Sequence, residues 1–168
     1  ISEYQDDASA QGRLYAWRVA WQVAIHHFFG GGMMYQNPLL FTLYGNGEGT
    51  VIAAHSIYFQ VLGEHGFIGL FLFLGMWWSV WRSAKWLIKN GGKEPETKWC
   101  QYLGAMSQVS LIGYAVGGAF LSLSYFDLPY NALVMVVLTR SWMQRRAWLS
   151  EQPSTVTAET MAGVLKKS

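Results

Sequence analysis

Charged residues and cysteines are both scarce in this chain. Only 13% of its 168 residues are charged, whereas an average soluble protein has about 25%. The net charge of +2 excludes the strongly basic surface that a nucleic-acid-binding protein carries. Cys100 is the single cysteine, which excludes an intramolecular disulfide. The low charge therefore argues against an ordinary soluble domain.

A start methionine, a signal peptide and a recognisable metal motif are also missing. The chain begins with Ile1 and has no signal-peptide pattern, so we expect a piece of a longer protein. The neighbours His26 and His27 point about 100° apart on a helix and rarely share one ion. Because there is also no cysteine pair and no His-Glu-x-x-His sequence, we expect no structural zinc site.

Long uncharged stretches and aromatic residues are abundant instead. Hydrophobic residues make up 52% of the chain, with nine Trp and 18 Gly, a composition typical of membrane interfaces and of helix contacts inside membranes. A bilayer core needs about 20 apolar residues. The uncharged run 99–126 exceeds this length. Two further runs, 66–88 and 128–143, are adequate if their Arg and Lys side chains snorkel toward the headgroups.

These runs predict an all-α integral membrane fold with about three transmembrane helices and a helical segment on the outer face. We divide the chain into a periplasmic segment, 1–65, three transmembrane helices within 66–143, and a disordered cytoplasmic tail, 144–168. Ten of the twelve Lys and Arg residues lie around the connector after the first run or at and beyond the end of the third run. With three spans, these two regions fall on the same side. The positive-inside rule makes that side cytoplasmic.

The outer segment contains two predicted helices. One apolar face recurs at steps of three and four residues, comprising Leu14, Trp17, Trp21, Ile25 and Phe28. Asp7 or Ser9 is expected to cap the start of this helix, and Gly30 to end it. A second helix is predicted over residues 52–63, with a break at 64–66 before the first transmembrane run.

Two residues of this segment have side chains suited to chemistry. His55 sits just outside the first transmembrane run, where an imidazole can accept a proton from a hydroxyl or simply cap a helix. Arg13 has a guanidinium fork that suits phosphate oxygens, or it forms a surface ion pair with Asp6 or Asp7. Asp127 can orient His55 or cap a helix. The glycines within 113–118 predict a close helix contact in the membrane.

Two motifs resemble those of a known superfamily. His55-Ser56, nine residues and then Gly66-Phe67-Ile68-Gly69 resembles the His-[Asn/Ser/Gln]-x9-Gly-x-x-[Gly/Thr/Tyr] signature of O-antigen ligases and Wzy-type polymerases. Upstream, residues 7–13 resemble the Asp-x-Ser-x-x-x-Arg segment of the same superfamily. The run 53–67 looks most similar to the O-glycosylation ligases associated with exosortase A. The resemblance covers about residues 6–130.

This resemblance implies a multi-span inner-membrane glycosyltransferase of GT-C type that uses no metal and no nucleotide cofactor. Such enzymes transfer a glycan from undecaprenyl pyrophosphate to a hydroxyl of a lipid or protein acceptor, with inversion. By motif position, His55 would be the catalytic histidine and Arg13 would bind the pyrophosphate. Ser56 and Asp7 would be substrate-binding residues. The earlier spans and a second arginine of the family have no counterpart here, so we expect no activity from this piece alone.

Two other functions remain open at this point. A Wzy-type polymerase of the same superfamily would use another lipid-linked glycan as its acceptor. A non-catalytic membrane subunit would pack through the glycines within 113–118.

Overall fold

The structure is a computed structural model that describes residues 2–45 and 49–145, with side chains from Ser9 onward except that of Leu128. Every regular element in these residues is a helix, which confirms the predicted all-α class. The predicted disordered tail, 144–168, lies outside the described residues from residue 146 onward. The elements are α1 (Ser2–His26), α2 (Pro38–Tyr44), α3 (Ile57–Asn90), a short 3-10 helix η1 (Pro95–Thr97), α4 (Lys98–Gly118) and α5 (Asp127–Gln144).

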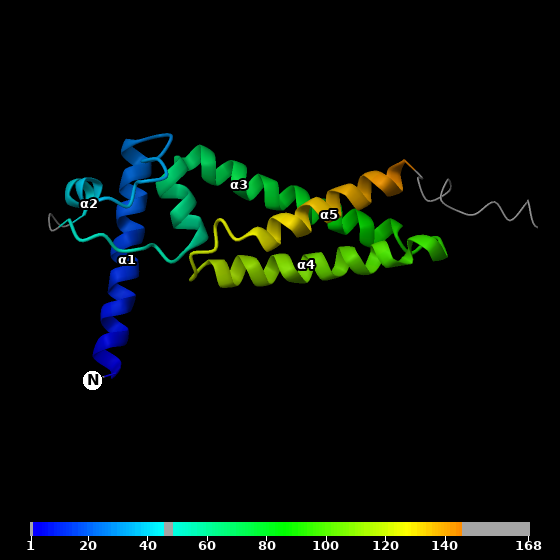
Figure 1. Cartoon of the computed structure of the whole chain (residues 1–168), viewed down its shortest axis with the longest axis horizontal. Coiled ribbons are helices and arrows are strands. Elements are labelled where there is room, and N and C mark those ends of the chain that lie inside the picture. The colour runs from blue at the N-terminus through cyan, green and yellow to red at the C-terminus, as the bar shows by residue number, and fades with distance from the viewer. Residues whose placement is uncertain (1, 46–48, 146–168) are drawn as a thin grey trace, which may run out of the picture.

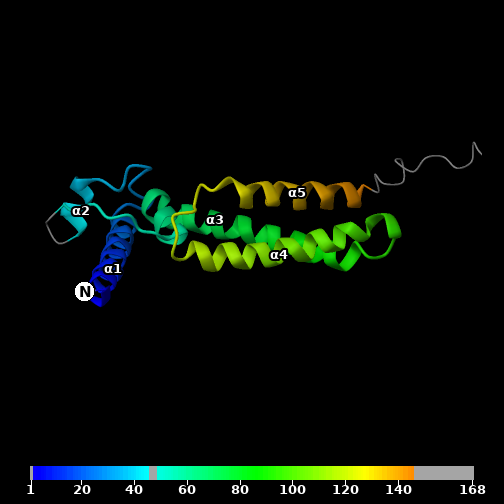
Figure 2. The ribbon, with the colours of Figure 1, turned by 60° about the horizontal axis from the view of Figure 1, so that its bottom comes forward.

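Helices α3, α4 and α5 form an antiparallel bundle, with α1 and α2 at one end (Figures 1 and 2). The centre of the bundle is a cluster of buried side chains: Val80, Ala84, Leu87, Cys100, Val136 and Met143. A Cβ on Gly104 would lie 2.7 Å from the carbonyl oxygen of Ala84. The backbones of α3 and α4 therefore approach closely here, as small residues permit.

The close contact predicted for residues 113–118 is wrong at two of its three glycines. A Cβ on Gly113 or Gly117 would meet no atom within 4 Å, whereas one on Gly118 would lie 2.5 Å from Cδ1 of Ile57. The spacing of glycines does not reveal which face of α4 meets α3. A second close contact, against the backbone of α3, lies at Gly104, nine residues before Gly113.

The outward surface of the bundle is apolar, as a bilayer requires. Its exposed side chains include Phe71, Leu72, Trp78, Met106, Val109, Ile112, Val116, Val134, Met135 and Leu138. Among the described helices, α3 alone passes a test of length and composition for a membrane span. The helices reach ~36 Å (α3 after residue 66), ~32 Å (α4) and ~27 Å (α5) at 1.5 Å per residue. Three spans therefore remain a prediction.

Helix α3 breaks at Gly66, as predicted for residues 64–66. Gly66 has φ 67° and ψ −164°, a combination that is nearly exclusive to glycine. The loop after α1 crosses the helix here, since Gly31 N donates to Gly63 O at 2.8 Å and Gly32 N donates to Glu64 O at 3.0 Å. A Cβ on Gly66 would collide with the carbonyl oxygen of Phe28. The break thus separates an outer piece of α3, 57–65, from the long inner piece.

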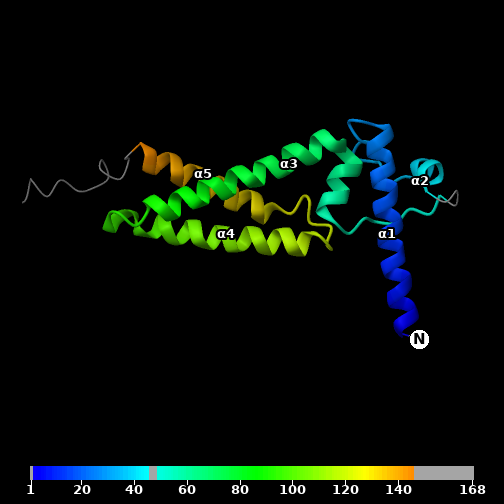
Figure 3. The same cartoon turned by 180° about the vertical axis from the view of Figure 1, so that it is seen from behind.

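Helix α1 lies across the end of the bundle rather than along it (Figures 1 and 3). Its buried face consists of small residues, namely Ala16, Val19, Ala20, Val23 and Ala24. The predicted apolar stripe is wrong, because Trp21 is 47% exposed and Phe28 is 62% exposed. Both faces of α1 are apolar, and the smaller side chains allow a closer approach of the neighbouring backbone.

The ends of α1 and the presence of α2 also differ from the predictions. Because α1 extends back to Ser2 and ends at His26, neither Asp7 nor Ser9 caps it, and its end precedes Gly30. Helix α2 was not predicted. Asn37 caps it by accepting a hydrogen bond from Leu40 N at 2.9 Å, and Pro38 occupies its first turn, where a missing N–H costs little.

Candidate functional site

Three segments meet at the end of the bundle that carries α1: α1 itself, residues 52–56 and the loop 119–126 between α4 and α5. Trp17 of α1 joins them. Its indole Nε1 donates to Ala54 O at 2.6 Å. Its ring stacks on Phe59 with centroids 4.7 Å apart and lies 6.5 Å from the ring of Phe120. The backbone next to His55 is therefore held from two sides.

His55 is exposed and has a left-handed backbone conformation, with φ 45°. It lies before α3 rather than on a helix, so the helix predicted over 52–63 is wrong in its first turn. The extended Ser56 (φ −157°) takes the N-cap position, and α3 begins at Ile57. A non-glycine residue in this region costs about 1–3 kcal/mol, and such strain concentrates at functional sites.

The imidazole of His55 has one polar side-chain neighbour among the described residues. The Oγ of Ser122, in the loop 119–126, lies 3.4 Å from its Nδ1. If Nδ1 carries the proton and donates to Ser122, the other ring nitrogen, Nε2, is left as an acceptor. The arrangement therefore suits an imidazole that receives a proton at Nε2.

Arg13 lies one turn before Trp17 on the same face of α1. A Cβ on its neighbour Gly12 would lie 3.5 Å from Ile52, so this part of α1 faces the segment that leads to His55. The Nε of Arg13 is buried and has no hydrogen-bond partner among the described residues. The side chains of Asp6 and Asp7, its predicted ion-pair partners, lie outside the described part.

Of the other predicted residues, Ser56 is buried and Asp127 is exposed. Ser56 is 1% exposed and makes no capping hydrogen bond. Asp7 lies on α1, but its side chain is outside the described residues. Asp127 is the first residue of α5, while Phe126 is the N-cap residue, so the prediction that Asp127 caps this helix is wrong. The binding roles of Ser56 and Asp7 stay predictions.

Sequence reasoning missed Ser122 and Glu64. Ser122 fell inside the predicted second span because residues 99–126 carry no charge, yet α4 ends at Gly118. The adjacent glycines 117 and 118, with serines 122 and 124 soon after, were an available sign of a helix end. Glu64 was seen as part of the helix break, and its burial could not be read from its neighbours in the chain.

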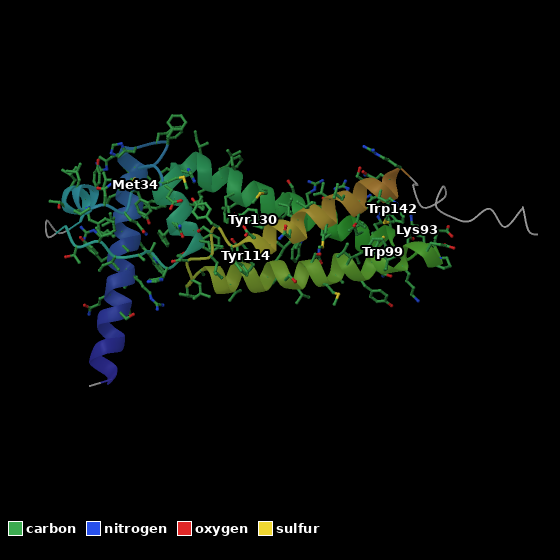
Figure 4. All side chains as sticks on the ribbon, in the orientation of Figure 1. Met34, Lys93, Trp99, Tyr114, Tyr130 and Trp142 are labelled. Carbon is green, nitrogen blue, oxygen red and sulfur yellow. The ribbon has the colours of Figure 1, made fainter. Side chains whose placement is uncertain are left out.

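Basic residues gather at the opposite end of the bundle. Lys93, Trp99 and Trp142 are seen at that end in Figure 4, whereas Met34 lies beside α1. Arg140 of α5 donates from Nη1 to the Oγ of Ser83 at 3.0 Å and lies over the ring of Trp86, 5.5 Å from its centroid. The guanidinium of Arg140 therefore finds partners inside the bundle, whereas the sequence predicted that it would only extend toward the lipid headgroups.

A sequence model of the O-antigen ligase family matches residues 1–74, which include α1, α2, His55 and the break in α3. The match supports the O-antigen ligase superfamily, a group of bacterial membrane proteins with ligase-like or glycosyltransferase-like enzymes. It supports a membrane function of the ligase or polymerase type, with a lipid-linked glycan and an acceptor as the implied partners. No curated protein and no solved structure matches the chain.

Proposed function

We propose that the chain forms part of a membrane glycosyltransferase of the O-antigen ligase type. The reaction moves a glycan from undecaprenyl pyrophosphate to a hydroxyl of a lipid or protein acceptor. The observation that carries the proposal is the exposed imidazole of His55, on a left-handed backbone, at the same end of the bundle as the buried Nε of Arg13. Both residues lie in the family-matched segment.

In the proposed step, the acceptor hydroxyl oxygen forms a bond to the anomeric carbon while the bond from that carbon to the phosphate oxygen breaks. The hydroxyl proton goes to Nε2 of His55, and the electron pair of the broken bond leaves with the pyrophosphate. A single displacement of this kind inverts the anomeric carbon. A positioned general base contributes about 10²–10⁴-fold to such a rate.

Arg13 has the binding role in this proposal. Its guanidinium pairs with pyrophosphate oxygens and neutralises the charge that develops on the leaving group. The buried Nε supports this role, since the described residues give it no internal partner. Asp7 and Ser56 contribute to substrate binding, for which the support is their place in the resembling motifs.

We place the site on the periplasmic face of a bacterial inner membrane that α3, α4 and α5 cross. The support is the separation between the His55 end and the end that carries Lys93 (Figure 4). Basic loops stay in the cytoplasm during insertion. Within the superfamily, the run 53–67 favours the O-glycosylation ligases associated with exosortase A. An exosortase gene near the gene for this protein would support that placement.

The test is glycan transfer by the complete protein in proteoliposomes loaded with a lipid-linked glycan and an acceptor. We expect His55→Ala to abolish measurable transfer and His26→Ala to leave it intact, because His26 is also exposed but its Nδ1 bonds Gln22 O within α1. Unchanged transfer by His55→Ala would instead favour a packing subunit. A product ladder from the parent protein would indicate a polymerase, because a ligase transfers one entire chain.

A further inference from the structure

A buried carboxylate lies nine residues after His55, next to the break in α3. Glu64 is 5% exposed. Its Oε2 accepts a hydrogen bond from the hydroxyl of Tyr125, and its Oε1 accepts one from Nε2 of Gln60 at 3.2 Å. The nearest basic group, Nε2 of His65, is 3.9 Å from Oε2. Burying a carboxylate is costly unless its oxygens are well bonded.

The tyrosines around Glu64 are suited to act as hydrogen-bond donors. Burial, aided by the charge of Glu64, raises the pKa of Tyr35 to about 12. Burial also raises the pKa of Tyr125, and the hydrogen bond to Glu64 raises it further. Both hydroxyls keep their protons at neutral pH. Tyr125 therefore donates to a carboxylate, which is a stronger bond than one between neutral groups.

Gln60 and Glu64 of α3 together hold the loop that carries Ser122. Gln60 lies one turn before Glu64, and its Oε1 accepts a hydrogen bond from the Oγ of Ser124 at 3.1 Å. Glu64 holds Tyr125, the next residue. The loop is thus tied to α3 two and three residues after Ser122, whose Oγ lies 3.4 Å from Nδ1 of His55.

We propose that Glu64 is a positioning residue that acts through the loop 119–126. By accepting from Tyr125 and Gln60, it fixes this loop so that Ser122 meets Nδ1 of His55. That contact orients the imidazole, and when Nδ1 donates to Ser122 it leaves Nε2 as the proton-accepting nitrogen. The inference rests on the proposed function of His55, but the placement of the loop can be measured without any glycan transfer.

The experiment measures how fast cysteines at positions 55 and 122 are bridged by a short bifunctional thiol reagent. The complete protein carries His55→Cys, Ser122→Cys and Cys100→Ala, with any cysteine outside these 168 residues also replaced, since Cys100 is the single cysteine within them. We expect Tyr125→Phe and Glu64→Gln each to slow bridging by about tenfold. The first removes the hydroxyl that donates to Glu64, and the second removes the negative charge and one of the two oxygens that accept from Tyr125 and Gln60. Glu64→Ala should slow it more, so Gln should partly rescue Ala.

Matched controls separate this effect from a general loss of structure. Glu96→Gln and Tyr102→Phe change exposed residues of the same types and should leave the bridging rate unchanged. A second cysteine pair, Trp99→Cys with Trp142→Cys, reports the packing of α4 on α5 at the opposite end of the bundle, since the two rings lie 5.8 Å apart. Bridging of this pair should be unaffected by the Glu64 and Tyr125 variants.

A bridging rate at 55 and 122 that stays within about twofold of the parent, in both Tyr125→Phe and Glu64→Gln, would overturn the proposal. If Glu64→Ala does not fold, these two milder variants decide the result. In the parent background, Ser122→Ala and Tyr125→Phe should lower kcat for transfer by similar factors and leave the KM for the lipid donor unchanged. If transfer survives His55→Ala while bridging still depends on Glu64, the proposed function fails and the positioning role stands.

Discussion

The bundle and the end that carries α1 are held together by different means. The bundle has a core of aliphatic side chains around Val80 and Val136 and a close backbone approach at Gly104. The other end has a smaller apolar cluster of Val19, Val23 and Phe41. It combines this cluster with directed hydrogen bonds, with a positive φ at His55 and Gly66 and with the buried Glu64. A hydrophobic core can be built from many different sequences. Backbone strain and buried charged groups, in contrast, are concentrated at functional sites.

In the proposed topology, the two ends face opposite sides of the membrane. On a Cys100→Ala background, we expect a cysteine in place of Met34 to react fully with an impermeant thiol reagent added to the periplasmic side. A cysteine in place of Gly92, in the basic connector, should react after the membrane is permeabilised. Labelling of residue 92 from the periplasm, with residue 34 protected, would reverse the proposed orientation.

The break in α3 should tolerate substitution poorly. Gly66→Ala places a Cβ against the carbonyl oxygen of Phe28 and forces alanine to a φ of 67°. We expect the free energy of unfolding in detergent to fall by about 3 kcal/mol or more, combining backbone strain with the collision. In the matched variant Gly75→Ala, a Cβ meets open space, so a small gain of under about 1 kcal/mol is expected.

Substitution of Arg13 and Arg18 tests whether the end of the bundle that carries α1 binds an anion. Arg13→Ala should raise the KM for the pyrophosphate-linked donor by about 10- to 100-fold, since a hydrogen bond to a charged group is worth about 1.5–3 kcal/mol. Arg18 is exposed and points about 140° away around α1, so Arg18→Ala should leave KM unchanged. Equal effects of the two substitutions would indicate general charge attraction instead of a binding site.

Within the bundle, substitution of two glycines of α4 by alanine should change the free energy of unfolding by different amounts. Gly104→Ala forces a Cβ to within 2.7 Å of Ala84 O, whereas a Cβ at Gly113 meets nothing within 4 Å. We expect about 1–3 kcal/mol of destabilisation for Gly104→Ala, as for other overpacked sites, and no loss for Gly113→Ala. Thermal unfolding in detergent measures both. The reverse ranking would restore the contact predicted from the sequence at residues 113–118.

Much of the bundle could be predicted because its signals are local. The apolar run 128–143, which includes Arg140, matches α5 (Asp127–Gln144) closely, and glycine marks the break at residue 66. The face that α1 buries could not be predicted, since both of its faces are apolar. The end of α4 was missed because the loop 119–126 is as uncharged as a membrane span until Asp127.

The candidate site could be predicted only where its residues are marked by local sequence patterns. His55 and Arg13 stand out because of their chemical types and their motifs. Ser122 is 67 residues from His55 in the chain, and Tyr125 is 61 residues from Glu64. Contacts over such separations depend on how the helices pack, which local patterns do not encode. The residues that surround the imidazole of His55 could therefore be identified only from the structure.

The most direct test of the account is the single-turnover rate of glycan transfer by His55→Ala with the lipid-linked donor already bound. The account predicts that this rate falls by about 10²–10⁴-fold, the usual contribution of a general base, while the affinity for the donor stays at the parent value. A chemical step as fast as that of the parent protein, or a loss of donor binding that explains the entire defect, would contradict it.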